Sequence, residues 1–122
     1  MSTVSSILMA AVPDQITPAA TTANSGTDVV ISWTSPASDQ GSALTRYRIT
    51  FKQTDGIFSE YSTSCDGTGV ILSGNTCTVP MTAFLAAPYN LNKGDLIVAI
   101  VEGLNAVGYS TPSVENTSGA LV

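Results

Sequence analysis

Two cysteines, nine acidic side chains and one Asn-Thr-Ser triplet are the groups of this 122-residue chain most open to chemistry. Cys65 and Cys77 lie twelve positions apart, and each stands beside a turn signal, Asp66-Gly67 or Gly74-Asn75. Such turns bring two strand ends together in a hairpin, which suits a disulfide. The alternative is a pair of free, buried thiols. A disulfide predicts an oxidising, extracellular compartment.

The triplet Asn116-Thr117-Ser118 is an N-glycosylation sequon, so Asn116 is a candidate glycan site. A glycan there agrees with an extracellular location. Single triplets of this kind also arise by chance, and the disulfide therefore carries more of the prediction.

Catalysis has few groups to draw on. The chain has no histidine, the usual acid–base group near neutral pH. Short acidic side chains at strand ends usually close their own turns, and those on outer strand faces are usually solvated. No nucleophile triad, phosphate-binding glycine loop or calcium loop is present, so we expect no enzyme, no cofactor and no metal. The acidic residues considered are Asp28, Asp39, Asp55, Asp66 and Asp95 at strand ends, and Glu60 and Glu102 on outer faces.

Charge excludes some partners. The net charge is −5 with four basic residues, so the phosphate-neutralising patch that nucleic acids need is missing, and an anionic membrane surface is disfavoured. Three of the basic residues, Arg46, Arg48 and Lys52, fall on one predicted strand. They form either an exposed face that pairs with nearby acids or a docking face for an acidic partner or a glycan.

The chain is also poor in charge for a soluble domain. Charged residues make up 11% of it, against about 25% on average, and the mean hydropathy is +0.27. No apolar run reaches the roughly 20 residues that span a bilayer. Either part of the surface is buried against other chains, or glycans keep it solvated.

Short strand-like runs recur along the chain and are separated by Gly, Pro, Asn and Asp clusters, which is typical of all-β domains. Apolar residues alternate with polar ones around Trp33 and again from Tyr47 to Phe51. These patterns predict a seven-stranded antiparallel β-sandwich. The expected strands cover about 15–24, 29–34, 46–52, 57–62, 77–81, 96–104 and 109–116.

From about Pro13 to Val114 the chain resembles fibronectin type III modules. The resemblance rests on the opening proline, Trp33, the Tyr47-x-Ile49 strand and Val101-x-Gly103-x-Asn105-x-x-Gly108-x-Ser110-x-x-Ser113. It implies the same sandwich, with an immunoglobulin-like relative as the alternative. No Arg-Gly-Asp occurs in the 105–108 loop, so integrin binding is not carried over.

The chain departs from this family in two places. Ile97 stands where the family usually has the tyrosine of the tyrosine corner, and Tyr89 is the candidate substitute. The cysteine pair resembles a variant found in large, repetitive surface proteins of protists.

The first twelve residues are an apolar segment ahead of the module. They are the remnant of a secretory signal, a disordered tail, or an arm that docks on another copy. A signal would need a basic start, and disordered tails are usually polar. The weak first strand, 15–24, would leave an edge for such an arm. The residues expected to make this contact are Val4, Ile7, Leu8 and Met9.

These observations predict an N-terminal arm at 1–12, a sandwich at 13–116 and a C-terminal tail at 117–122. The expected function is that of a non-enzymatic extracellular structural protein that assembles head to tail, through the arm, into a fibre or coat. The alternative is a spacer or adhesion module of a larger cell-surface protein that binds a protein or glycan through its loops. The expected partners are copies of the chain or other extracellular proteins and glycans, without nucleic acid or membrane insertion.

Overall fold

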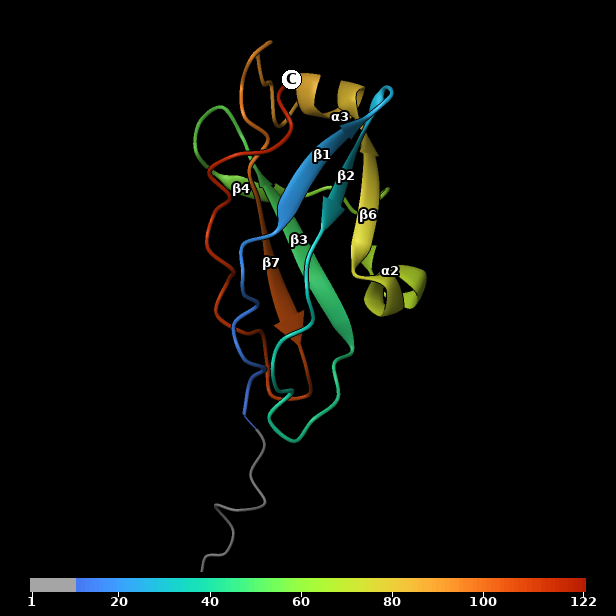
Figure 1. Cartoon of the computed structure of the whole chain (residues 1–122). Helices are drawn as coiled ribbons and strands as arrows, with labels where there is room; N and C mark the ends of the chain where they lie inside the picture. Colours follow the sequence, from blue (N-terminus) through green and yellow to red (C-terminus); the bar gives the residue numbers. More distant parts are fainter. Residues whose placement is uncertain (1–10) are drawn as a thin grey trace, which may run out of the picture.

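Two antiparallel sheets pack face to face in the computed structural model, which describes residues 11–122 (Figure 1). The first sheet has the order β1 (Thr21–Ser25), β2 (Asp28–Ser32), β6 (Thr76–Pro80). The second is built on β3 (Arg46–Lys52), which pairs with β7 (Ala99–Leu104) along one edge. Its other edge pairs with β4 (Phe58–Glu60) and β5 (Asp66–Gly67).

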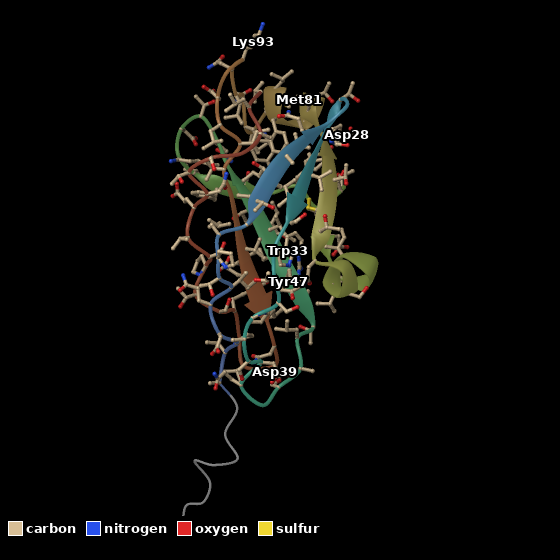
Figure 2. The ribbon with its side chains drawn as sticks, viewed as in Figure 1. Asp28, Trp33, Asp39, Tyr47, Met81 and Lys93 are labelled. Atoms are coloured by element: carbon tan, nitrogen blue, oxygen red, sulfur yellow. A yellow bond between two sulfur atoms is a disulfide. The ribbon has the colours of Figure 1, made fainter. Side chains whose placement is uncertain are left out.

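The core lies between the sheets and follows the predicted alternation. In β3, Tyr47, Ile49 and Phe51 are buried, and the strand occupies the predicted residues, 46–52. Trp33, at the end of β2, is 7% exposed and meets the Tyr47 ring edge-on, with centroids 5.3 Å apart (Figure 2). An edge-to-face pair of this kind stabilises beyond its buried area. The predicted antiparallel sandwich is confirmed.

Gly103 in β7 is where the packing needs room. A Cβ atom there would lie 3.2 Å from Leu44 Cδ2 and 3.7 Å from Pro13 Cβ. The Leu44 side chain would therefore have to shift by a few tenths of an ångström, whereas Pro13 would lie in ordinary contact.

Helices are short in this fold. They are α2 (Gly69–Gly74), between β5 and β6, and α3 (Met81–Leu85), directly after β6. Neither was expected from the sequence, which suggested turns and a connection in these places. Within residues 11–122, no helix has the length and apolarity that crossing a membrane requires.

The cysteines form the predicted disulfide, but no hairpin joins them. Cys65 precedes β5 in the second sheet, whereas Cys77 lies in β6 in the first sheet. α2 makes the connection between them, and β5 and β6 pair with different strands. The bond therefore links the two sheets on one side of the sandwich.

The expected last strand, 109–116, is not a strand. Three polar side chains in it, spaced three residues apart, are buried and accept hydrogen bonds from backbone N–H groups of β7. A spacing of three is that of an extended polyproline-like chain, whereas a strand repeats every two residues. The pairs are Ser110 Oγ with Gly103 N (3.0 Å), Ser113 Oγ with Val101 N (2.9 Å) and Asn116 Oδ1 with Ala99 N (2.9 Å).

The last six residues belong to the sandwich rather than to a separate tail. Ala120 is 1% exposed, and its N–H donates to Thr22 Oγ1 at 2.9 Å. Gly119 has a φ of 141°, and a Cβ atom there would collide with Thr22. Leu121 bridges to Leu96, and its carbonyl accepts from Asn24 Nδ2 at 3.4 Å, so this segment lies between β1 and the residues around Leu96. The first strand begins at Thr21, six residues later than expected.

Candidate functional site

The predicted docking face is already paired within the chain. Arg46, Arg48 and Lys52 stand on β3, and each has an acidic partner on a neighbouring segment. The structure thus shows the pairing with nearby acids, and docking of an acidic partner or a glycan on this face stays a prediction. The pairs are Arg46 Nη2–Glu60 Oε2 (2.9 Å), Arg48 Nε–Glu102 Oε1 (2.8 Å) and Lys52 Nζ–Glu115 Oε1 (3.6 Å).

Arg48 is the centre of this face. It bonds both carboxylate oxygens of Glu102, its cross-strand partner on β7, and its guanidinium lies 3.8 Å from the centre of the Tyr109 ring. The hydrogen bond to Glu102 raises the pKa of Arg48, and burial opposes that shift. Glu102 is 8% exposed, so the expectation of a solvated side chain there is wrong. The cluster ties β3 to β7 and to the segment after it.

A shallow hollow of about 370 Å³ lies beside this cluster and includes Phe58 and Ile100 in its walls. Thr50 also lines it and is 8% exposed. Its hydroxyl has no hydrogen-bond partner among the described residues. The hydroxyl oxygen is itself buried, so it does not face the hollow.

Asn116, the predicted glycan site, is 7% exposed. Its Nδ2 donates to Ile97 O and to Ser118 O, both at 3.0 Å. A glycan would be carried on this same nitrogen, inside the fold. The geometry therefore argues against a glycan on the folded domain.

Three of the five aspartates expected at strand ends close turns by accepting a backbone N–H. Asp39 accepts from the backbone N–H of Gly41 and Asp55 from that of Ile57, both at 3.0 Å. Asp95 accepts from the N–H of Asn92 at 2.8 Å. Asp66 instead accepts the Thr68 hydroxyl at 3.0 Å. No group of three or more His, Cys, Asp or Glu side chains that could hold a metal occurs among residues 11–122.

Tyr89, the candidate substitute for the tyrosine corner, bonds a distant strand instead of the backbone a few residues upstream. Its ring is buried against Phe51 and Phe84, and its hydroxyl donates to Ser59 O of β4 at 3.0 Å. Burial raises the pKa of this phenol. Ile97 is fully buried, as an aliphatic residue in that place should be. The hydrogen bond of the Tyr89 hydroxyl thus joins the connection around Tyr89 to β4.

The described chain begins at one end of the sandwich, here called the arm end. Ala11 is held there by two hydrogen bonds, from its N–H to Gln40 O (3.2 Å) and from Asn105 Nδ2 to its carbonyl (2.7 Å). Asp39 marks the same end in Figure 2. The expected contact residues of the arm lie outside the described residues; they are Val4, Ile7, Leu8 and Met9.

The opposite end, here called the C-terminal end, carries the loop around Lys93 and the last residue (Figures 1 and 2). Gly94 N–H donates to Val122 O at 2.7 Å, so the loop and the chain end are joined. Leu85 of α3 and Leu121 are exposed in this region. The two ends of the described chain therefore point away from each other.

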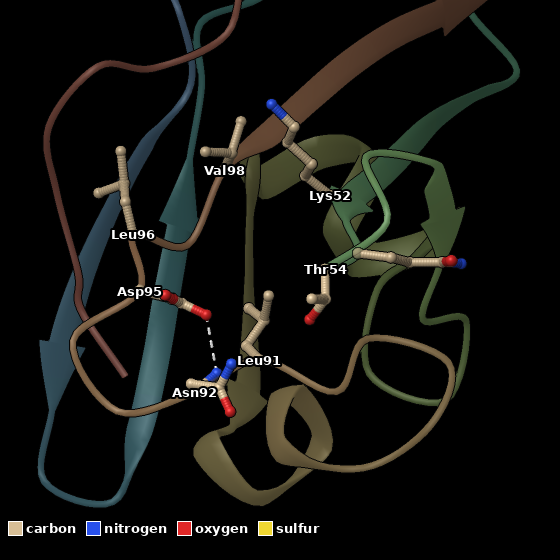
Figure 3. A pocket seen from close by; sticks show the side chains of 8 residues that line it. Lys52, Thr54, Leu91, Asn92, Asp95, Leu96 and Val98 are labelled. Carbon is tan, nitrogen blue, oxygen red and sulfur yellow. Dashed lines mark hydrogen bonds between the residues drawn. The ribbon is translucent and has the colours of Figure 1, made fainter.

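A pocket of about 360 Å³ opens at the C-terminal end (Figure 3). We call it the C-terminal pocket. Its walls combine three aliphatic side chains with a polar rim, and Asn92 is exposed at the rim. No feature of the sequence pointed to it, because its walls come from two loops and the end of β3. The lining residues are Leu91, Leu96 and Val98 with Lys52, Gln53, Thr54, Asn92 and Asp95.

The edge at which the arm was expected to dock is partly covered. Thr22 and Asn24 of β1 bond to Ala120 N and Leu121 O of the last segment. A hollow of about 390 Å³ remains lower down, between 18–22 and 116–119. We call it the edge hollow.

No protein-family model matches this chain, and no curated protein is significantly similar to it. Solved structures do match. "Titin kinase and its flanking domains" shares 24% identity over 88% of this chain, with a TM-score of 0.63. Titin domains A168–A170 share 23% over 93%, with a TM-score of 0.62. The twitchin kinase region from C. elegans shares 21% over 92%, with a TM-score of 0.61.

The chain spans 17%, 32% and 16% of those three chains, so the match concerns one domain of each. It concerns the fold alone. The chain has the β-sandwich fold of fibronectin type III and immunoglobulin-like domains.

Proposed function

We propose that this chain is a non-enzymatic structural module that joins copies of itself end to end, through the N-terminal arm, into an extracellular fibre or coat. The observation that carries the proposal is the placement of the two chain ends. The segment that follows the arm and the C-terminal residues lie at opposite ends of the sandwich (Figure 1). A module with its two chain ends at opposite ends can contact one copy at each end, so that the copies lie in a row.

The polar groups of the domain support a structural role. The basic side chains of β3 are paired, and the aspartates of three turns bond their own backbone. These groups serve the fold, which leaves few to act on a substrate. The low charge of the chain fits a surface that is partly buried between copies.

The disulfide supports the extracellular location. Disulfides persist in oxidising compartments, and cytosolic thiols are kept reduced. In this chain the bond joins the two sheets, and both cysteines are buried.

Deletion of residues 2–9 tests the proposal. Ala11 is bonded to the sandwich, so the deletion should stop before it. The intact chain should sediment as polymers and show filaments by negative-stain microscopy, whereas the deleted chain should remain monomeric. Two double variants of the arm separate the loss of apolar side chains from other changes in the arm. The test variant is Ile7→Ser with Leu8→Ser, and its matched control is Ser5→Ala with Ser6→Ala. An intact chain that stays monomeric at high concentration, or a deleted chain that still polymerises, contradicts the proposal.

The hollow beside Thr50 favours one second candidate, an adhesion module of a larger cell-surface protein. The walls of the hollow combine Phe58 and Ile100 with the charged Arg48 and Glu60, which suits a protein or glycan ligand. Glu60→Trp, at an exposed position in the wall, should block such binding with little loss of stability, and glycan-array or pull-down signals unchanged by this variant would exclude the hollow.

A further inference from the structure

We infer that the C-terminal pocket receives the N-terminal arm of the next copy. This inference rests on the proposed function and assigns the acceptor site that the function requires. The arm is the donor, and Leu91, Leu96 and Val98 provide the apolar wall on which it would lie.

The positions of donor and acceptor define the assembly. The arm joins the sandwich at Ala11, next to Gln40 and Asn105, and the pocket opens at the other end of the molecule. A contact between two different surfaces at opposite ends is head to tail, and repeating it gives an open chain. The ten residues before Ala11 reach at most about 33 to 36 Å when extended, which is long enough to cross a junction between copies.

The chemistry of the arm matches the pocket. Residues 1–10 contain no charged side chain and mix Ser and Thr with aliphatic residues. Val4, Ile7 and Leu8 would cover the aliphatic wall. The rim offers the exposed Asn92 side chain beside Asp95 (Figure 3), which suits the backbone and hydroxyls of an extended segment. Lys52, also at the rim, is paired with Glu115, so it does not require an acidic ligand.

The edge of β1 is the weaker acceptor. Two of its side chains, Thr22 and Asn24, bond the last segment of the same chain, which lies beside it. The edge hollow lies beside that contact and remains the rival position for the arm. Both sites can be blocked separately, because Ala19 lines the edge hollow and Asn92 lines the C-terminal pocket.

Asn92→Trp is the main test. The residue is exposed, and the bond that its backbone N–H donates to Asp95 survives the change, so the fold should be retained. A tryptophan at the rim should fill the pocket and raise the concentration at which polymers form by at least about ten-fold, since about 1.4 kcal/mol in binding corresponds to that factor. Thr82→Trp, an exposed position on α3 outside the pocket, is the matched control and should polymerise like the unchanged chain. Ala19→Trp should also leave assembly unchanged.

A mixing experiment sharpens the test. The chain without residues 2–9 keeps the pocket but has no donor, and the Asn92→Trp chain keeps the arm but has a blocked pocket. Each should be monomeric alone, and together they should form a one-to-one dimer that does not grow, measured by sedimentation velocity. A synthetic peptide of residues 1–10 should bind the deleted chain and should bind at least about ten-fold more weakly when Asn92→Trp is added.

The outcomes separate the two proposals. Polymers that form normally with Asn92→Trp, or that are lost with Ala19→Trp instead, overturn the inference and leave the proposed function standing. An intact chain that never assembles overturns both. Val98→Ser is the second pocket variant, and thermal melting of every variant with the disulfide intact shows whether a loss of assembly comes from the pocket or from unfolding.

Discussion

The two open sides of this sandwich are closed by different means. On the side of β6, one covalent bond between Cys65 and Cys77 joins the sheets. On the side of β7, Ser110 and Ser113 bond the strand through both backbone and side chain, Asn116 bonds it through its side chain, and 117–122 lies beside β1. Unpaired strand edges promote unwanted pairing, so both sides must be closed in a stable module.

The difference lies in where each device acts. A disulfide stabilises mainly by restricting the unfolded chain, and it depends on two residues. The side-chain bonds stabilise the folded state directly, and each depends on one polar atom in one place. The covalent side should therefore respond to redox conditions, whereas the polar side should respond to single substitutions.

The largest effect is expected on the covalent side. Replacing both cysteines by alanine should lower the free energy of unfolding by about 3 kcal/mol, the value for a loop of this length. Urea denaturation of the variant and of the unchanged chain, with and without reductant, measures it. Equal midpoints for the oxidised and reduced chain would show that the bond contributes nothing.

The next largest loss of stability is expected on the polar side, for Asn116→Ala. It removes the acceptor of Ala99 N–H and the donor to Ile97 O in a buried place, which should cost about 2 to 3 kcal/mol. Ser118→Ala is the control, because it destroys the sequon and leaves the bonds of Asn116 intact, so its effect should be near zero. A large effect of Ser118→Ala in secreted protein would instead indicate a glycan.

Ser113→Ala should cost about 1 to 2 kcal/mol, because Val101 N–H loses its buried acceptor. Thr111→Ala, an exposed change in the same segment, should stay within about 0.5 kcal/mol. Thermal melting of the pair measures the difference. Equal melting temperatures would mean that water replaces the serine oxygen and that the three-residue spacing is not needed.

Tyr89→Phe should have the smallest effect at neutral pH, about 1 kcal/mol for the lost bond to Ser59 O. Because burial raises the pKa of Tyr89, the fold favours the neutral phenol. Its contribution is full below the ordinary pKa of 10.0 and is lost as the pH rises through the raised value. Stability measured from pH 8 to 11 should fall less steeply in Tyr89→Phe than in the unchanged chain, and parallel curves would contradict this.

Local patterns predicted the parts of the fold that depend on neighbours in the chain. The alternation from Arg46 to Lys52 places β3 correctly, because one buried face demands that period. The turn roles of Asp39 and Asp55 follow from side chains that reach a backbone N–H two residues on. The cysteines were paired correctly, but the expected hairpin between them was wrong because α2 carries the chain from one sheet to the other.

The candidate sites were predicted less well. A basic row on one strand looks the same in sequence whether its acidic partners are near or far, and here they come from β4, β7 and the segment after it. A sequon carries no information on burial, so the bonds of Asn116 could not be foreseen. The C-terminal pocket is built from segments around Thr54, Leu91 and Val98, which no short pattern connects.

Residue order alone therefore settles the fold class, the core alternation, the cysteine pair and the apolar, uncharged arm, since each depends on composition or on residues close in the chain. The tertiary structure decided which sheet each cysteine joins and how 109–116 bonds to β7. It also decided where the last residues lie and that a pocket opens opposite the arm. These features depend on contacts between segments far apart in sequence, such as Ala120 with Thr22, and only the packed sheets bring those segments within hydrogen-bond distance.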